Sequence, residues 1–213
     1  MLPFSIPIFP LPTVVLFPNV FLPLHIFEPR YRQMVTESLA GDRIIGMVLL
    51  QPGYETEYEG RPPIYATGCS GLITHSERLD DGRFNLVLQG LEKFTVHAEE
   101  EPAVGRLYRS AVITPLGESV AAHERDELRN QRQRLETLLA PLLAGGLERN
   151  LPAAMPDEDL VNALAQYLEF EPLEKLALLE QRGALARCRT MVDLLEIKAM
   201  SGPGNRDPGT VIH

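Results

Sequence analysis

Proline placement near the N-terminus sets the strongest limit on how this chain folds. The prolines are Pro7, Pro10, Pro12, Pro18, Pro23 and Pro29, and the segment around them is apolar. Because proline lacks a backbone N–H and has a fixed φ, no helix can run through this segment. The stretches 14–17 and 22–27 are rich in β-branched and aromatic residues, which favour strands. We therefore predict strands at the edge or corner of a barrel, where missing N–H donors are tolerated.

The dipeptide Glu28-Pro29 ends this segment and predicts the start of a helix. Proline suits the first turn of a helix, and an acidic residue is stabilised near the positive end of the helix dipole. We expect a helix from 30 to about 40 that plugs or flanks the barrel.

The chain up to residue 117 has the pattern of a β-rich domain. We predict strands over 43–50, 64–75, 83–89, 93–97 and 106–114. Gly68 and Gly71 indicate a bulge or bend in the second of these strands. The sequence Leu79-Asp-Asp-Gly82 predicts a hairpin turn, and Gly90-Leu91-Glu92 a second turn. Several strands with one inserted helix are typical of a barrel or pseudobarrel.

From residue 118 the composition changes to helix formers. We predict helices over 118–146, 156–170, 171–182 and 184–200, with the first bent or ended early by Pro141 and terminated by Gly145-Gly146. The fold class is therefore α+β, a β pseudobarrel with an inserted helix followed by an α-helical bundle. The predicted domains are 1–117 and 118–200, and we expect the tail 201–213 to be disordered.

Charge and cysteine content exclude several classes of protein. The net charge of −9 argues against a nucleic-acid partner, because such proteins present basic faces. The two cysteines, Cys69 and Cys188, form no CxxC pair, so we expect no structural zinc. Unpaired thiols fit a reducing cytosol. No run of apolar residues is long enough to span a membrane, so we expect a cytoplasmic protein with no membrane partner.

No motif indicates catalysis or a cofactor. The chain has no Gly-Lys dipeptide for a phosphate-binding loop, and Gly68-Cys-Ser-Gly71 lacks the spacing of a serine nucleophile elbow. His123-Glu124 lacks the second histidine of a zinc protease. Asp80 and Asp81 precede a glycine, which makes them turn residues. We therefore predict no catalytic residue, no metal site and no cofactor.

Three segments together resemble the N-terminal, substrate-recognition domain of the Lon ATP-dependent proteases, in its stand-alone bacterial form. These are 6–31 with its Glu28-Pro-Arg-Tyr31 motif, 68–94 with Leu79-Asp-Asp-Gly-Arg-Phe84, and 171–180. The resemblance implies a PUA-like pseudobarrel followed by a helical bundle. In the protease this region binds unfolded or tagged polypeptides, and the ATPase and peptidase domains follow it. Neither activity is carried over to this chain.

Two residues of the family motif are the candidate binding residues. In a structural interpretation, Arg30 pairs with a carboxylate and Tyr31 packs at the interface between helix and barrel. In a functional interpretation, Arg30 and Tyr31 lie on a groove that receives a peptide. The sequence leaves both open.

The leading hypothesis is a non-enzymatic module that binds unfolded or tagged polypeptides, as an adaptor or holdase in protein quality control. The alternatives are an RNA-binding PUA-like protein, a small-molecule sensor or enzyme, and a structural partner subunit. A weak homo-oligomer is also left open.

Overall fold

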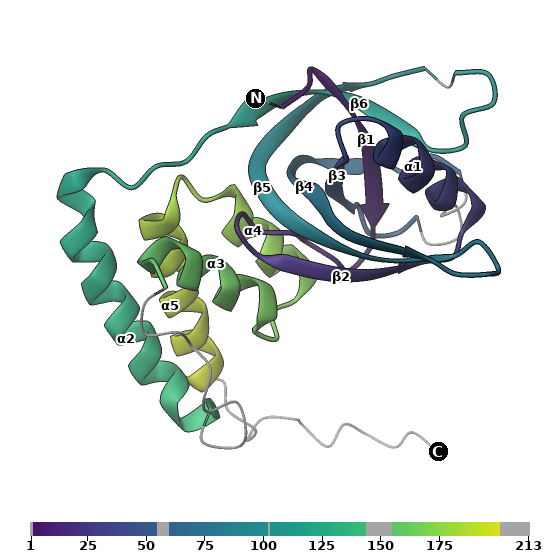
Figure 1. Cartoon of the computed structure of the whole chain (residues 1–213). Coiled ribbons are helices and arrows are strands. Elements are labelled where there is room, and N and C mark those ends of the chain that lie inside the picture. Colours follow the sequence, from purple (N-terminus) through teal and green to yellow (C-terminus); the bar gives the residue numbers. More distant parts are fainter. Residues whose placement is uncertain (1, 55–59, 102, 144–154, 201–213) are drawn as a thin grey trace, which may run out of the picture.

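A computed structural model describes residues 2–54, 60–101, 103–143 and 155–200. The strands are β1 (Ser5–Leu11), β2 (Phe21–Ile26), β3 (Ile44–Leu50), β4 (Ile64–Arg78), β5 (Phe84–Glu99) and β6 (Arg109–Leu116). They form one sheet in the order β2-β5-β4-β3-β1-β6. A further pairing of β5 with β6 closes five of the strands into a barrel (Figure 1). Among the described strands β2 pairs only with β5, so it lies at the edge of the sheet, which is one of the two positions predicted for this segment.

The prolines of β1 fit the barrel because this strand changes partners halfway. β1 pairs with antiparallel β6 from Ser5 to Ile8 and with parallel β3 from Ile8 to Leu11. Pro7 and Pro10 therefore each have a ladder partner on one side only, and the missing N–H can face the other side. β1 is thus an interior strand that changes partners at Ile8, so of the two predicted positions, edge or corner of a barrel, it does not occupy the edge.

The predicted turn at Gly90-Leu91-Glu92 is wrong, because β5 continues through it as one strand. Gly90 pairs with Gly71 of β4 on one side, and its N–H donates to the Val20 carbonyl on the other at 2.8 Å. A Cβ at Gly90 would lie 2.0 Å from the carbonyl oxygen of Phe17. The glycine therefore permits close approach of two backbones, a role that the sequence does not distinguish from a turn.

The predicted strand over 14–17 is also wrong. This stretch has no strand pairing, although Val15, Leu16 and Phe17 are buried. The N–H of Phe17 donates instead to Oε1 of Gln166, at 3.2 Å. A side chain from the helical part thus satisfies the backbone donor that a strand neighbour would otherwise satisfy.

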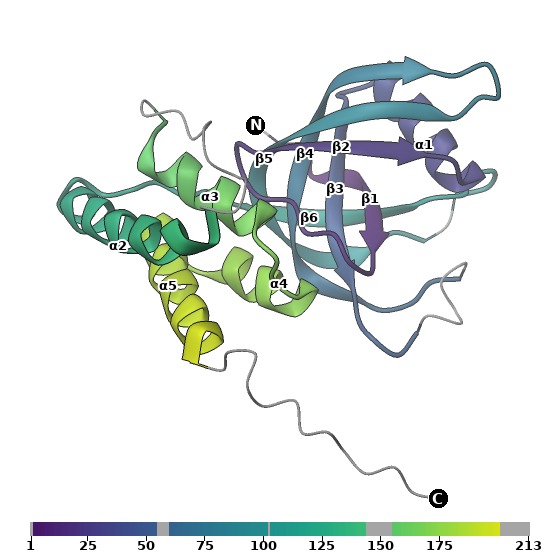
Figure 2. The same cartoon turned by 90° about the horizontal axis from the view of Figure 1, so that it is seen from below.

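The hairpin and the inserted helix are confirmed. Gly82, with φ +80, closes the turn by donating its N–H to the carbonyl of Leu79. The β4–β5 register shifts between Cys69 and Gly71, where a bulge was expected. Helix α1 (Pro29–Ala40) follows Glu28 and buries Met34 and Val35 against the barrel. It lies on the side of the barrel away from the C-terminal helices (Figures 1 and 2).

The C-terminal half is helical, as predicted, with different bounds. Its elements are the 3₁₀ turn η2 (Ala122–Glu124), α2 (Arg125–Leu143), α3 (Asp157–Tyr167), α4 (Pro172–Glu180) and α5 (Ala184–Met200). No helix starts at residue 118, because Glu118 is used in contacts with the barrel and α5. Helix α2 runs through Pro141 to Leu143, so the proline does not end it. Gly145-Gly146 and the tail 201–213 lie outside the described residues.

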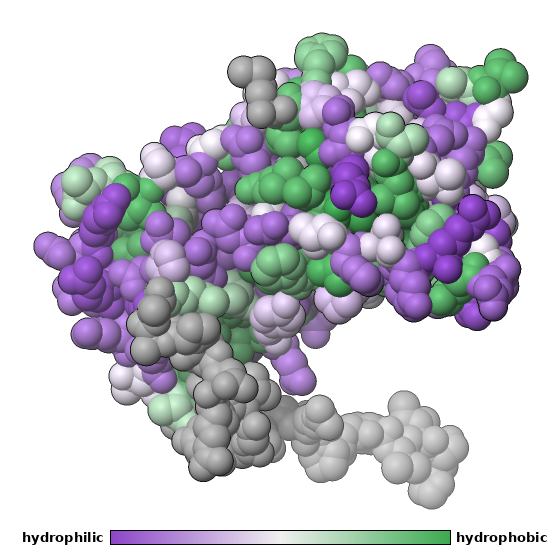
Figure 3. Space-filling view, in the orientation of Figure 1, coloured by the Kyte–Doolittle hydropathy of each residue, from purple (hydrophilic) through white to green (hydrophobic). Residues whose placement is uncertain are grey.

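One large hydrophobic cluster connects the barrel to the helices. It contains barrel residues such as Phe17 and Leu88 together with helical residues such as Leu160 and Met191. Helix α4 lies between α5 and the barrel in both views (Figures 1 and 2). The outer surface of α2 is largely polar, whereas apolar side chains gather on the barrel (Figure 3). No helix in the described part of the chain has the length and apolar character needed to cross a membrane.

Candidate functional site

An apolar groove lies where the barrel meets α4. Strands β1 and β3 are parallel neighbours, so their C-terminal ends lie side by side at the same end of the barrel. The groove has a volume of about 580 Å³. Its lining is mainly apolar and includes Pro12, Leu50, Tyr54, Pro62, Pro172 and Leu173. Leu173 is 50% exposed and Tyr54 40%, so a partner has apolar surface left to bury.

The start of α4 is held in place by local sequence. Pro172 occupies the first turn, and the N–H of Glu171 donates to Oε2 of Glu174 at 2.8 Å. Lys198 of α5 forms a 2.8 Å ion pair with Glu174 and lies over the ring of Phe170. These contacts fix the first turn of α4, and with it Leu173 at the groove.

A second, smaller cavity lies near the N-terminus of α1 and is lined by cationic and aromatic side chains. Its volume is about 220 Å³. The main lining side chains are Arg30, Arg61, Arg106, Arg109, Tyr31 and Tyr108. We call it the arginine cavity. No carboxylate from the described residues lines it.

Carboxylates behind this lining hold the arginines in position. Glu99 accepts from Arg109 at 2.5 and 2.8 Å and from Arg61 at 3.0 Å. Glu100 accepts from Arg106 at 3.3 Å, and its backbone carbonyl accepts from Arg61 at 3.1 Å. Burial alone would raise the pKa of Glu99, but the hydrogen bonds from Arg109 and Arg61 outweigh it and lower that pKa.

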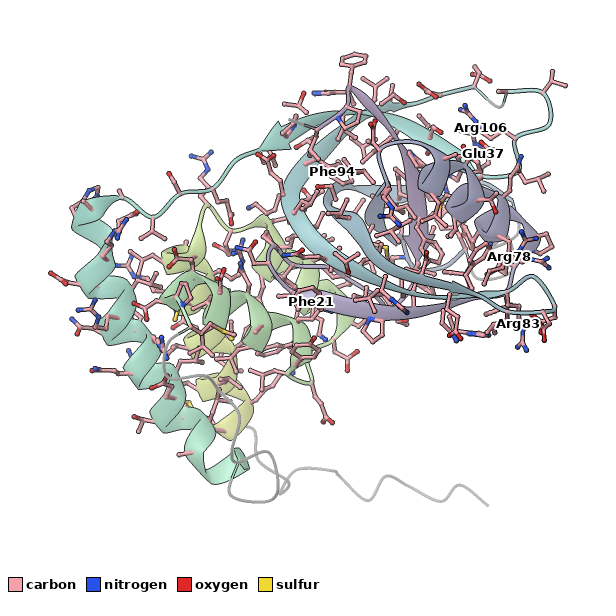
Figure 4. The ribbon with its side chains drawn as sticks, in the orientation of Figure 1. Phe21, Glu37, Arg78, Arg83, Phe94 and Arg106 are labelled. Carbon is pink, nitrogen blue, oxygen red and sulfur yellow. The ribbon has the colours of Figure 1, made fainter. Side chains whose placement is uncertain are left out.

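Helix α1 supports the other wall of the cavity. Gln33 donates to the carbonyl of Gly105 and accepts from the N–H of Leu107, which attaches the segment before β6 to the helix. Tyr108 donates to Glu37 at 2.6 Å, and the guanidinium of Arg106 lies over the Tyr108 ring (Figure 4 labels Glu37 and Arg106). Burial, followed by the charge of Glu37, raises the pKa of Tyr108 to about 12.

Arg30 and Tyr31, the candidate binding residues, make the contacts of the structural interpretation and also line the arginine cavity. Arg30 forms a 2.9 Å ion pair with Glu28 and lies 4.5 Å from the centre of the Tyr31 ring. Tyr31 is buried, packs on Phe9 and donates to the carbonyl of Pro10. Both interpretations of the motif therefore remain open, and the motif gave no signal for the other arginines that line the cavity.

The groove and the arginine cavity are neighbours, because adjacent residues of the same two segments line both. Pro12 lines the groove and Pro10 the cavity. In the segment before β4, Pro62 lines the groove and Arg61 the cavity. Two segments of the chain, one at Pro10 and Pro12 and one at Arg61 and Pro62, thus contribute to both the groove and the cavity.

A buried charge network, also missed by the sequence reasoning, joins the barrel to the helices. Glu118 accepts from Lys93 of β5 at 2.5 Å, and its two carboxylate oxygens accept from Nη2 of Arg187 of α5 at 2.9 and 3.0 Å. Lys93 also donates to the carbonyls of Leu179 and Gln181 at the end of α4. Burial lowers the pKa of Lys93 and Glu118 opposes this. The only feature of the sequence that could have indicated this network is Lys93, a lysine among apolar residues of β5.

The residues that were weighed for chemistry have structural contacts. The Ser70 hydroxyl donates to the carbonyl of Glu92 at 2.9 Å and lies inside the sheet. Asp81 accepts from the backbone N–H of Arg83 at 3.0 Å, which is a turn contact. Burial raises the pKa of Cys69 and that of Cys188, the latter to about 12. Within the described ranges, no three His, Cys, Asp or Glu residues are grouped to hold a metal ion.

Comparisons with known proteins agree on one family. The family model described as ATP-dependent protease La (LON) substrate-binding domain matches residues 5–196. The chain is 32% identical to a Lon protease of Flavobacterium johnsoniae over 119 residues, which is 55% of this chain and 14% of that protein. The matches cover 11% to 24% of the length of the curated Lon proteases compared.

Solved structures show the same fold. The N-terminal domain of a Mycobacterium avium complex Lon protease matches with a TM-score of 0.68 at 16% identity, covering 90% of this chain and 98% of that one. A Lon N-terminal domain protein from Xanthomonas campestris matches with a TM-score of 0.61 at 22% identity, covering 89% and 97%.

Proposed function

This chain belongs to the ATP-dependent protease La (LON) substrate-binding domain family, and we propose that it binds segments of polypeptide without changing them chemically. The partners we propose are unfolded or tagged proteins. The family membership supplies the class of ligand. The role of Arg30 and Tyr31 in that binding is part of the proposal.

The observation that carries the proposal is the apolar groove. It combines a volume of about 580 Å³ with half-exposed Leu173 and Tyr54 on a rigid support of β1, β3 and α4. Fully burying one leucine contributes about 1.5–3 kcal/mol. An extended peptide segment can bury its apolar side chains in such a groove, which contributes binding free energy. Main-chain hydrogen bonds can add to that binding.

The test measures binding of a permanently unfolded polypeptide, reduced and alkylated and carrying a fluorescent label, to the full chain. We expect saturable binding with Kd of about tens of micromolar or tighter. Leu173→Gln should weaken it about tenfold, because one apolar contact is lost.

Phe4→Gln is the matched control. Phe4 is 75% exposed but precedes β1, at the end of that strand opposite the groove. Its replacement should leave the Kd unchanged. Absence of saturable binding by the wild-type chain, or equal losses in the two variants, would contradict the proposal.

The cellular role is a further part of the proposal. A binding module of this kind in the cytoplasm serves as an adaptor or holdase in protein quality control. The net charge of −9 supports polypeptide over RNA as the ligand. The PUA-like description of the barrel and the separate helical bundle also remain proposals.

A further inference from the structure

We propose that the arginine cavity binds a carboxylate of the polypeptide whose apolar side chains lie in the groove. This inference rests on the proposed function and adds a chemical requirement to it. This carboxylate is either the C-terminus of the peptide or an acidic side chain. Both present the same charged group to the arginines.

The first support is the availability of donors on Arg61 and Arg106. In the described part of the chain, the hydrogen bonds of Arg61 come from Nη2, whereas Nη1 of Arg106 donates to Glu100 and Ser110 and its guanidinium lies 5.4 Å from the centre of the Tyr108 ring. Their side chains are 40% and 32% exposed. Each guanidinium therefore retains N–H groups in a planar arrangement that suits a carboxylate.

The second support is preorganisation. Arg61 and Arg106 both contact Glu100, the first through its backbone carbonyl and the second through its carboxylate. Arg109, 8% exposed, holds Glu99 with two hydrogen bonds and donates to the Pro62 carbonyl. Two guanidinium groups are thus held at one cavity before a ligand arrives, which lowers the entropic cost of binding.

The third support is charge and size. Guanidinium groups line the cavity. Glu28, Glu37, Glu99 and Glu100 contact these groups or Tyr108 but are not among the lining residues, so the interior favours an anion. A volume of about 220 Å³ is below the usual range of sites for whole small molecules, roughly 300–1,000 Å³, and suits one functional group of a larger ligand. The neighbouring groove takes the remainder.

Three short, labelled peptides that end in leucine test the inference with the full chain. The first has a free C-terminal carboxylate, the second has a C-terminal amide, and the third is amidated with a glutamate after the leucine. We expect the first or the third peptide to bind about tenfold more tightly than the second, because charged hydrogen bonds are added. Which of them does so identifies the source of the carboxylate.

Variants then locate the contact. The double variant R61Q/R106Q should remove this preference and leave the Kd of the amidated peptide unchanged. Arg134→Gln is the control, because Arg134 is an exposed arginine in an ion pair with Glu196, on helices away from the cavity. It should retain the preference. Unfolding by urea checks that each variant is folded.

The outcomes separate this inference from the proposed function. If all three peptides bind with the same Kd, the carboxylate inference is overturned and polypeptide binding stands. If the preference persists in R61Q/R106Q, the inference is also overturned. If neither these peptides nor the unfolded polypeptide bind, the proposed function itself fails.

Discussion

At the scale of single residues, a few buried charged side chains connect the barrel to the helices by hydrogen bonds and ion pairs. Arg187 is fully buried and donates to Glu118, to Oδ1 of Asn162 and to the carbonyl of Leu178. Lys93 approaches the same carboxylate from the barrel. Buried ion pairs contribute little net stability when intact, but removing one partner leaves an uncompensated charge.

We predict that Glu118→Gln destabilises the protein by about 3–5 kcal/mol, because Lys93 and Arg187 lose their shared carboxylate. Urea unfolding measures this. The control is Glu127→Gln, whose ion pair with Arg189 is half exposed on both sides and should contribute at most about 1 kcal/mol. If the two substitutions lower the unfolding free energy equally, the buried network contributes no more than an exposed ion pair.

Glu99 makes stability depend on pH. Its pKa is lowered in the folded protein, so the unfolded chain binds more protons in the window below 4.5, its ordinary value. Its contribution is therefore present above about pH 4.5 and is lost as the pH falls through the folded pKa. We expect the difference in unfolding free energy between the wild type and Glu99→Gln to shrink with acidification in that window. A constant difference would contradict this account.

At the scale of elements, β5 organises the barrel. Its first part pairs with β2 and β4, and its second part with β4 and β6. One strand can serve both sets of partners because it continues through Gly90. The sequence Gly90-Leu91-Glu92 has the composition of a turn, and only the packing of Phe17 against the strand distinguishes the two.

We predict that Gly90→Ala destabilises the protein by about 2 kcal/mol or more, because the new Cβ meets the backbone oxygen of Phe17, which cannot rotate away. Thermal or urea unfolding provides the measurement. Gly117→Ala is the matched control, since its Cβ would meet only the flexible carboxylate of Glu92, at 3.2 Å. A loss as large at Gly117 would refute the backbone explanation.

At the scale of the whole molecule, barrel and helices are joined by more than the chain connection. Asn162 donates to the carbonyl of Pro18, and Tyr167 to that of Phe21. Asn19 donates to Asp159 at 2.7 Å. With the shared hydrophobic cluster, these contacts favour one cooperative unit. The division into 1–117 and 118–200 remains a prediction about folding units.

Leu160→Ala tests that division. Leu160 of α3 is fully buried, and its truncation should cost about 2–5 kcal/mol. Amide hydrogen exchange should then show equal losses of protection free energy in β5 and in α5. A loss confined to the helices would mean that the two predicted domains unfold separately.

Local patterns predicted the elements that depend on neighbouring residues. Pro29 started α1, Asp80, Asp81 and Gly82 made the hairpin turn, and Glu171-Pro172 started α4. The family motif drew attention to Arg30 and Tyr31, and both line the arginine cavity, while their role in binding stays a prediction. The sequence could not place Arg61, Arg106 and Arg109 there. Arg61 precedes β4 whereas Arg106 and Arg109 lie just before and at the start of β6, and these two segments meet only in the folded chain.

The sequence by itself determined the α+β class, the strand near 22–27, most helix starts and the family. Helix and strand propensity, helix capping and turn preference depend on a few neighbouring residues, so they can be predicted from the sequence. Only the tertiary structure decided that β5 is continuous, that 14–17 is not a strand, and that groove and arginine cavity adjoin. Those outcomes depend on which distant backbone or side chain satisfies each buried polar group and fills each space.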